Sequence, residues 1–482
     1  MIFYFAWCFY PDFKNHLHRR PASRRCLSIL TAIISFNGLI SANHIFAKTT
    51  PNTNFDVTSY TLTLTPDIQN ETVSGHETIL LHAVSNALQR LDFTRNALTI
   101  ESALLDGIPL SSTQTGDNLT FNLPTPIPRG HTVKLELIYH GHPARGLARS
   151  ATALYTSYFA CDWMVCRQDA FGDKADFSLK LRVSSGMNTL SVGRLLSKQI
   201  EPDGSEVHLW KSPRPYSAYL YGFAIGHFAS VTNQVGLTKL TYLSDIAEAE
   251  ELKRRLASTN EMVHFLSEKA GIPLPVAEYS QLLVKGDEAQ EAATYSVIGM
   301  DELPTTNNDP AQDWVIIHEL THQWWGNLIT CATLQDFWLN EGITTFITAV
   351  WKEHLYGQAA YNAELNLARQ RLEKARNKGF DKPLAWNGDY PTLGIRRAVQ
   401  YSKGALFMDY LRTTLGDTAF WSGIRRYTRA HAGGTVTSID FEKDMETASG
   451  RDLHQIFNDW VFGVASQSTT PSSQPKNIIS PR

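Results

Sequence analysis

The sequence predicts a multi-domain chain in which a β-rich amino-terminal domain is followed by a mostly helical domain. Its 482 residues are more than one hydrophobic core usually supports. Apolar and polar residues alternate along much of the region from about 52 to 233, whereas apolar residues recur every three or four positions after about 236. This change of period predicts domains at 48–235 and 236–463.

The first domain is predicted to be all-β. Residues 57–64 and 132–139 alternate strictly between apolar and polar side chains, which is typical of strands with one buried face. Gly, Pro, Asn and Asp interrupt such runs at short intervals and indicate turns.

The second domain is predicted to be mostly helical, because its apolar residues follow the helical period. The helix that ends before Gly326 has Asn308 and Asp309 as capping residues and Pro310 at its first turn. The stretches expected to be helical are 246–270, 310–325, 337–354, 359–376, 397–414, 417–431 and 438–449.

The two ends of the chain are expected to lie outside the folded domains. Residues 1–47 resemble a signal segment, because Arg19, Arg20, Arg24 and Arg25 precede an uncharged, largely apolar stretch. We therefore expect export to the periplasm or the medium, with a membrane tether if the segment stays uncleaved. Residues 464–482 are rich in Ser, Thr, Pro and Gln and are expected to form a disordered tail.

The charge balance excludes nucleic acid as a partner, and the composition leaves the pairing of the cysteines open. The formal net charge of -3 gives no basic excess for binding nucleic acid. After the signal segment, Cys161, Cys166 and Cys331 remain. In an oxidising compartment the first two can pair and leave the third free, but three buried thiols are an equally good interpretation.

A metal-binding pattern is the strongest functional indication in the sequence. His318 and His322 are four residues apart and project from the same side of a helix, so both imidazoles can reach one zinc ion. Glu319 then faces the water that the metal activates and is predicted to be the general base. A catalytic zinc keeps three protein ligands, and Glu341 on the next predicted helix supplies the third. One Zn²⁺ per chain is predicted.

The spacing of these residues resembles the gluzincin aminopeptidases, the family of membrane alanyl aminopeptidase and leukotriene hydrolase. The resemblance rests on H-E-x-x-H, an eighteen-residue gap and W-L-N-E-G, and it extends from about Phe55 to about Gly463 through weaker matches such as Tyr139-His140-Gly141. It implies an amino-terminal β-sandwich-like domain packed on a thermolysin-like α+β catalytic domain. Larger members continue into a helical cap domain, so this chain looks like a short form without that domain.

The resemblance also implies residues that act beside the metal. Tyr401, in a Y-x-K-G-A segment, matches the tyrosine whose hydroxyl stabilises the oxyanion. Glu291 matches the glutamate that binds the substrate's ammonium group, with Glu288 as an alternative anchor. The family's second anchoring residue has no counterpart, because the stretch 154–158 offers hydroxyl groups and no carboxylate or amide.

These observations predict a zinc aminopeptidase that cleaves peptides with a free amino terminus. A zinc endopeptidase or another hydrolase on the same scaffold is the alternative. A catalytically silent peptide-binding relative is less favoured, because the three ligands, Glu319 and Tyr401 are all present. Arg396 and Arg397 are interpreted as a solvated helix face, with a contact to a substrate carboxylate as the alternative.

Overall fold

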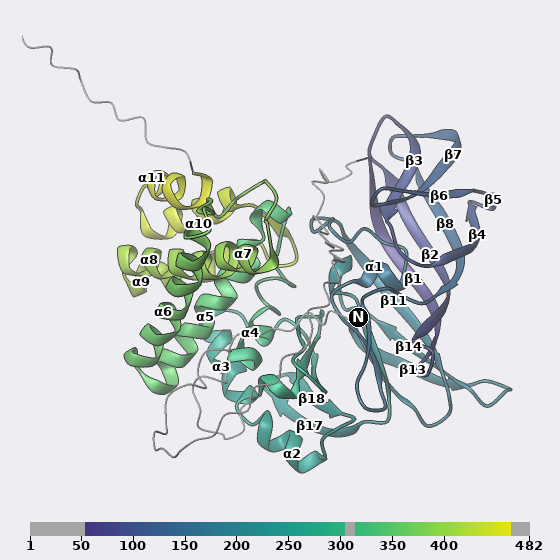
Figure 1. Ribbon diagram of the computed structural model, residues 1–482, viewed down its shortest axis with the longest axis horizontal. Coiled ribbons are helices and arrows are strands. Elements are labelled where there is room, and N and C mark those ends of the chain that lie inside the picture. The colour runs from purple at the N-terminus through teal and green to yellow at the C-terminus, as the bar shows by residue number, and fades with distance from the viewer. Residues whose placement is uncertain (1–53, 304–313, 464–482) are drawn as a thin grey trace, which may run out of the picture.

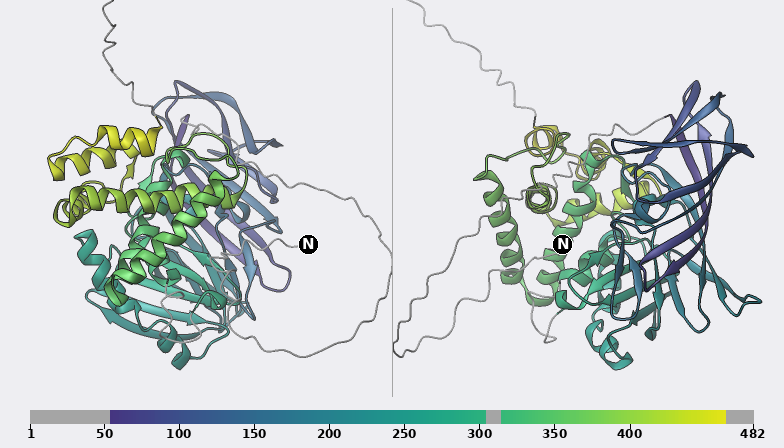
Figure 2. Two further views of the ribbon diagram at one scale, coloured as in Figure 1. Left: turned by 60° about the vertical axis from the view of Figure 1, so that its left-hand side comes forward. Right: turned by 45° about the vertical axis from the view of Figure 1, so that its right-hand side comes forward.

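The computed structural model describes residues 54–303 and 314–463, which form two parts lying side by side (Figure 1). The purple and blue strands make up the first part, and the green and yellow helices belong to the second. The right-hand view of Figure 2 shows the same separation from another direction. The predicted order, a β-rich domain followed by a helical domain, is confirmed. The predicted signal segment 1–47 and tail 464–482 lie outside the described residues.

The first domain is built on a nine-stranded sheet in which β1 pairs in parallel with β11 and antiparallel with β2. Along β1, Tyr60, Leu62 and Leu64 are buried while Thr61 between them is exposed, so the predicted alternation places one face on the core. In spatial order the strands are β13 (Arg194–Ile200), β14 (Glu206–Lys211), β11 (Lys174–Val183), β1 (Phe55–Asp67), β2 (Thr72–Ala83), β8 (Thr132–Gly141), β4 (Thr99–Leu105) and β5 (Ile108–Pro109), with β15 (Tyr216–Ser217) beside β11.

Two smaller sheets complete this domain and share its apolar core. Phe55 of the large sheet and Phe93 of the three-stranded sheet have ring centroids 5.6 Å apart. The three-stranded sheet contains β3 (Ala87–Thr94), β7 (Asn118–Pro128) and β6 (Ser112–Thr115). The four-stranded sheet contains β12 (Asn188–Ser191), β16 (Phe223–Gly226), β10 (Leu154–Thr156) and β9 (Leu147–Arg149), and the short helices are α1 (Ala160–Trp163) and η1 (Ala218–Leu220).

The second domain begins with a five-stranded sheet. Its order is β17 (Ala229–Val235), β18 (Thr238–Ser244), β19 (Glu278–Val284), β21 (Tyr295–Gly299) and β20 (Ala289–Gln290). The three central strands are parallel and both edge strands are antiparallel to them. Strand β17 precedes the predicted boundary at residue 235 yet belongs to this sheet. Alternation identifies a strand but does not tell which sheet the strand joins.

The helices of the second domain occupy most of the stretches that the sequence predicts. The predicted helix 246–270 is divided into α2 (Ala249–Arg255) and α3 (Thr259–Ala270). The others are α4 (Trp314–Thr321), α5 (Trp338–Tyr356), α6 (Gln358–Arg376), α7 (Leu393–Arg397), the π-helix η4 (Ala398–Lys403), α8 (Gly404–Leu415), α9 (Asp417–Ala430), α10 (Ser438–Ser449), α11 (His454–Phe457) and the π-helix η5 (Asn458–Phe462). The short elements η2 (Met300–Glu302), η3 (Leu334–Asp336), β22 (Thr330–Cys331) and β23 (Thr435–Val436) connect them.

Helix α4 ends earlier than predicted. The sequence extends it to Gly326, but its last residue is Thr321, and tighter turns follow in which Gln323 N bonds to Leu320 O (3.1 Å). These turns carry Trp324 and Trp325 into the core, where both are buried. The predicted cap at 308–310 lies outside the described residues.

The two domains are joined by a shared core and by a half-buried lysine. Lys174 of β11 donates from Nζ to the backbone oxygens of Asn327 (3.3 Å) and Leu328 (3.0 Å) in the second domain. Phe171 and Phe337 pack with ring centroids 5.3 Å apart across the junction. Within the described residues, we find no helix whose length and apolar content would let it cross a membrane.

Candidate metal centre

The two histidines of the predicted motif lie at the end of α4 and are fully buried. His322 follows the last helical residue, and its backbone N still bonds to His318 O (3.3 Å), so the helical spacing is kept. The two imidazole rings have centroids 4.9 Å apart. The sequence argument that both rings point to the same side is confirmed by this geometry.

Glu341 completes a group of three possible ligands. It lies in the first turn of α5, and its Oε2 is 3.5 Å from Nε2 of His318 and 3.5 Å from Nε2 of His322. The possible ligand atoms of the three side chains all lie within 4.8 Å of one another. The next helix therefore brings the carboxylate to the place that the spacing predicts.

Backbone and side-chain contacts orient these ligands. Nδ1 of His322 is 3.1 Å from the carbonyl oxygen of Trp325, which leaves Nε2 of the ring to face Glu341. Asn340 anchors the start of α5, because its Oδ1 accepts from Cys331 N (3.1 Å) and its Nδ2 donates to Tyr219 Oη (3.2 Å). The Asn of the W-L-N-E-G segment thus positions the neighbouring Glu341.

The charges at this point attract a cation. Burial raises the pKa of Glu341, but the charge of His322 and close contact with both imidazoles outweigh burial and lower that pKa to about 2. Burial lowers the pKa of His318 to about 4. Burial also lowers the pKa of His322, yet the charge of Glu341 outweighs it and raises the pKa to about 9. A buried, ionised carboxylate beside two imidazoles favours binding of a cation.

The three side chains fit a zinc ion. The 3.5 Å separations are too long for good hydrogen bonds, and Oε2 of Glu341 has no hydrogen-bond partner within the described part of the chain. Ligand atoms bound to one zinc at about 2.0–2.1 Å in a tetrahedral arrangement stand roughly 3.4 Å apart. Two imidazoles and one carboxylate are also a ligand set used by catalytic zinc.

Glu319 is next to this group and is completely buried. Neither of its carboxylate oxygens has a hydrogen-bond partner among residues 54–303 and 314–463. Burial raises the pKa of Glu319 well above its usual value, while His322 opposes the rise and the charges of Glu291 and Glu341 add to it. The carboxylate therefore has a high proton affinity, which suits a general base.

Tyr401 lies beside His318. It belongs to the π-helix η4, and its ring is nearly parallel to that of His318, with centroids 6.2 Å apart. Burial, followed by the charge of Glu341, raises the pKa of Tyr401 well above its usual value. The hydroxyl therefore stays protonated and can donate a hydrogen bond.

Glu291 is also brought to the site. It directly follows β20 and is buried, and its backbone oxygen accepts from Nδ2 of Asn327 (3.0 Å) in the turn beyond the histidines. Burial raises the pKa of its carboxyl, which His322 counteracts. A buried carboxylate in this position needs a cationic partner.

The sequence interpretation of two arginines is wrong in part. Arg396 and Arg397 are half-buried instead of forming a solvated face. Arg396 donates to Oε1 of Gln400 (2.7 Å) and stacks on the ring of Phe337 at 4.8 Å, while the charge of Arg397 acts on Tyr401.

Two residues at the edge of the site were not identified as partners from the sequence. Ser157 of the first domain donates from Oγ to Oε1 of Glu288 (2.8 Å), and the next residue, Tyr158, packs on the core of the second domain. The two bonded residues are 131 positions apart, and no local pattern indicates such a contact.

Comparisons with protein families match both domains. Residues 57–220 match the model described as Peptidase M1 N-terminal domain, and residues 256–460 match the Peptidase family M1 domain. The chain is similar to the probable aminopeptidase 2 of Sulfurisphaera tokodaii, with 24% identity over 323 residues that cover 64% of this chain and 41% of that protein. It is also similar to the aminopeptidase N of Lactobacillus helveticus, with 22% identity over 448 residues that cover 83% and 50%. The chain thus spans about half the length of these curated relatives.

Solved structures share the two-domain fold. The M1 zinc metallopeptidase from Deinococcus radiodurans has a TM-score of 0.70 and 24% identity, and the match covers 88% of this chain and 97% of that one. A mutant of the same enzyme bound to a Tyr-Ser-Ala substrate matches with the same TM-score and coverage.

Proposed function

Because this chain belongs to the peptidase M1 family, we propose that it is a zinc metallopeptidase that hydrolyses the first peptide bond of peptides with a free amino terminus. The observation that carries this proposal is the convergence of His318, His322 and Glu341 beside the buried carboxylate of Glu319. The aminopeptidases among the relatives support the choice of the amino-terminal bond.

The metal and Glu319 divide the chemistry between them. One zinc ion per chain, held by His318, His322 and Glu341, supplies a Lewis acid that lowers the pKa of water and polarises a carbonyl group. Glu319 accepts the proton of the attacking water at a carboxylate oxygen and later delivers it to the departing amine. Burial strengthens Glu319 as a base, because desolvation destabilises the charged carboxylate relative to the protonated form.

Tyr401 and Glu291 bind different groups of the first substrate residue, its carbonyl oxygen and its ammonium group. The hydroxyl of Tyr401 donates a hydrogen bond to the carbonyl oxygen as negative charge develops on it. Its raised pKa keeps that donor protonated. The carboxylate of Glu291 binds the substrate's ammonium group by a charge-assisted hydrogen bond, which restricts cleavage to the first residue.

Export is part of the proposal. The basic and apolar segment at 1–47 supports it, and so does the disulfide between Cys161 and Cys166, since disulfides persist in oxidising compartments. Among residues 54–303 and 314–463, Cys331 is the buried free thiol. Periplasmic or secreted protein is expected, tethered to a membrane only if the segment stays uncleaved.

A zinc endopeptidase is the second candidate, and one observation favours it. The segment of the first domain that faces Glu288 offers the hydroxyls of Ser157 and Tyr158 and no carboxylate for an ammonium group. With a single anchoring carboxylate, selection of a free amino terminus would be weaker.

One experiment separates these candidates. Purified protein is assayed on a panel of amino-acid amides and on the same amides with acetylated amino groups, with and without a chelator. We expect cleavage of the free amides alone, abolished by chelation and restored by zinc. Equal cleavage of acetylated amides would select the endopeptidase, and activity that survives complete zinc removal would overturn the metallopeptidase.

Two variants complete that test. Glu319→Gln should retain zinc and lose turnover, and Glu291→Gln should lose the preference for free amides. Glu268→Gln, which changes an exposed carboxylate on α3, is the matched control and should behave as wild type.

A further inference from the structure

A segment of the first domain reaches into the second domain beside the catalytic residues. The side-chain amide of Gln290, oriented so that both its ends are satisfied, donates to Thr156 O (3.1 Å) and accepts from Tyr158 N (2.9 Å). Ser157 between them donates to Glu288 (2.8 Å). Residues 156–158 are therefore held by hydrogen bonds to Glu288 and Gln290, which lie just before Glu291 in the chain.

Tyr158 has a backbone conformation that tyrosine rarely adopts. Its φ is 50°, in the left-handed region, which disfavours residues with a bulky side chain. Such a conformation persists only where the surroundings impose it, and it is found most often at functional sites. Gln290 holds the backbone N of Tyr158, and Nε2 of Gln168 donates to its backbone O (2.7 Å).

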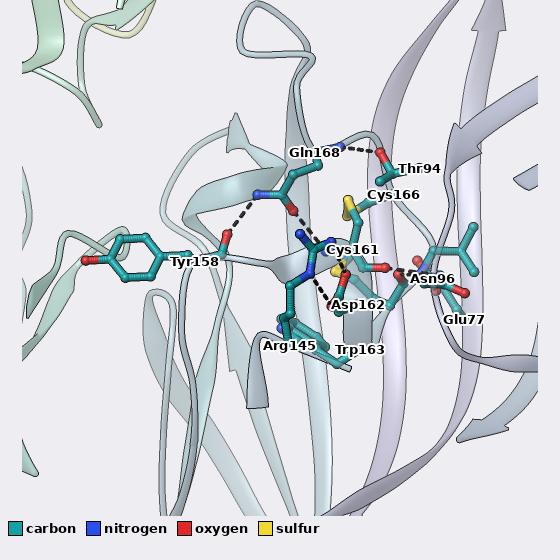
Figure 3. Close-up of a disulfide and its surroundings, with 12 residues drawn as sticks. Glu77, Thr94, Asn96, Arg145, Tyr158, Cys161, Asp162, Trp163, Cys166 and Gln168 are labelled. Carbon is teal, nitrogen blue, oxygen red and sulfur yellow. Dashed lines mark hydrogen bonds and ion pairs between the residues drawn. A yellow bond between two sulfur atoms is a disulfide. The ribbon is translucent and has the colours of Figure 1, made fainter. Parts of the chain in front are cut away.

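Gln168 is itself fixed by a loop that a disulfide closes (Figure 3). Its Oε1 accepts from the backbone N of Cys161 (3.1 Å), and its own backbone N donates to Oγ1 of Thr94 (2.9 Å). The disulfide joins Cys161 to Cys166, two residues before Gln168. Tyr158 is thus connected through one glutamine to a covalently closed loop.

The side chain of Tyr158 points away from the disulfide, toward the second domain (Figure 3). There it packs on the apolar core that also contains α4 and α5. Its hydroxyl lies where the charges of Glu288, Glu319 and Glu291 act on it, and burial together with these charges keeps the phenol protonated. A neutral hydroxyl on which these charges act can accept a hydrogen bond from an ammonium group that the carboxylates attract.

We propose that Tyr158 is a substrate-positioning residue whose hydroxyl contacts the ammonium group of the first substrate residue, and that Gln168, bonded to the disulfide-closed loop, holds Tyr158 in place. The inference rests on the proposed function, because Glu291 is the carboxylate that binds the same group. Tyr158 then gives the first domain a second contact to the ammonium group, although the segment 154–158 contains no carboxylate.

Direct binding separates this inference from the proposed function. Zinc-loaded Glu319→Gln protein, which should bind without turnover, is titrated with L-arginine amide in a calorimeter. Adding Tyr158→Phe should weaken binding about tenfold, the loss of one hydrogen bond to a charged group. Adding Tyr216→Phe, which removes a buried hydroxyl of β15, should leave the Kd unchanged.

The role of Gln168 is tested by a double-mutant cycle. Gln168→Glu keeps the size of the side chain and its acceptor for Cys161 N, but removes the donor to Tyr158 O. It should weaken binding in the same direction, and its effect should fall to less than about twofold when Tyr158→Phe is already present. The double variant Cys161→Ala with Cys166→Ala should behave like Gln168→Glu. If this double variant does not fold, the Gln168→Glu protein alone decides the test.

The outcomes are distinct. Equal affinity of the Tyr158→Phe and Tyr216→Phe proteins, independent effects of positions 158 and 168, or no binding of the amide would overturn the inference. Cleavage of acetylated amides by wild-type protein would overturn the proposed aminopeptidase instead. In active protein, Tyr158→Phe should raise KM while kcat changes little, a separation that a purely structural role would not produce.

Discussion

Gly342 and Gly404 meet where helices α5 and α8 cross, and a methyl group on Gly342 would stand 2.8 Å from the Cα of Gly404. Glu341 directly precedes the first glycine, and the turn that carries Tyr401 directly precedes the second. The contact of the two backbones therefore sets how close Glu341 and Tyr401, the proposed zinc ligand and oxyanion donor, come to each other. It gives a physical reason for a glycine in both W-L-N-E-G and Y-S-K-G.

Gly342→Ala should destabilise the protein and reduce its activity, because the new methyl group pushes the two helices apart. We expect a loss of about 1–3 kcal/mol in the free energy of unfolding, measured by urea denaturation, together with a lower kcat. Gly394→Ala is the control, since its added carbon meets nothing closer than Thr392 Oγ1 at 3.9 Å. Wild-type stability in Gly342→Ala would contradict the role of this contact.

Tyr401→Phe should lower kcat by roughly 10²–10³-fold, the effect of removing one oxyanion donor. KM should change little, because the hydrogen bond strengthens only as charge develops on the carbonyl oxygen. Steady-state kinetics on a free amino-acid amide measures both quantities, and zinc content checks that His318 beside the ring still binds metal. A variant with nearly full kcat would remove Tyr401 from the mechanism.

Removing zinc should lower the melting temperature. The carboxylates of Glu341, Glu319 and Glu291 are buried together and need positive charge. A ligand that binds only the folded protein stabilises it by about 4 kcal/mol when its free concentration is about 1,000-fold above its Kd. Calorimetric scans with and without chelator measure the shift, and His322→Ala protein should show little response. A chelator that leaves the wild-type transition in place would argue against the site.

Lys174→Met should weaken both stability and zinc binding. Its Nζ donates to two backbone oxygens in the turn that follows His322, so the variant leaves two buried acceptors without their donor. We expect a loss of about 1–3 kcal/mol and a higher zinc Kd in a competition titration. Lys180→Met, an exposed change on the same strand, should match wild type. Equal zinc affinity in the two variants would show that the turn does not depend on Lys174.

Glu77 should make the first domain pH-sensitive. It is buried beside the disulfide loop, where its Oε2 accepts from Val165 N (2.9 Å), and burial raises its pKa from 4.5 to about 8. The folded protein keeps a proton that the unfolded chain releases, so this stabilising contribution is complete below pH 4.5 and is lost as the pH rises through about 8.

Glu77→Gln should remove this dependence. Urea unfolding at about pH 5 and about pH 9 should show that wild type loses more stability than the variant between the two values. Equal losses in both proteins would mean that Glu77 is ionised throughout or that another group dominates.

Local patterns in the sequence predicted the metal centre, because each part of it follows from regular structure. A helix places residues four apart on one side, so His318 and His322 meet by geometry alone. Glu341 was placed by the need for a third ligand on the next helix. Tyr401 needed the resemblance as well, because neither segment indicates that α5 and α8 cross. The order of a β-rich and a helical domain followed from periodicity in the same way.

Contacts between distant segments could not be predicted from the sequence. The hydrogen bonds that hold Tyr158 come from Gln168 and from Gln290, which lies in the other domain, and neither residue has a local pattern that points to it. The assignment of β17 to the second sheet and the end of α4 at Thr321 likewise depend on packing. The pairing of Cys161 and Cys166, which composition left open, was decided by the short helix that brings them together.

The apolar interior of the first domain includes Leu282, Tyr295 and Phe337 of the second, so the boundary in the chain is not a boundary in the core. Cutting the protein near residue 228 to obtain a minimal catalytic fragment would strip these side chains of their neighbours and expose them to water. Such a fragment should aggregate, and engineering of this protein has to treat both halves as one folding unit.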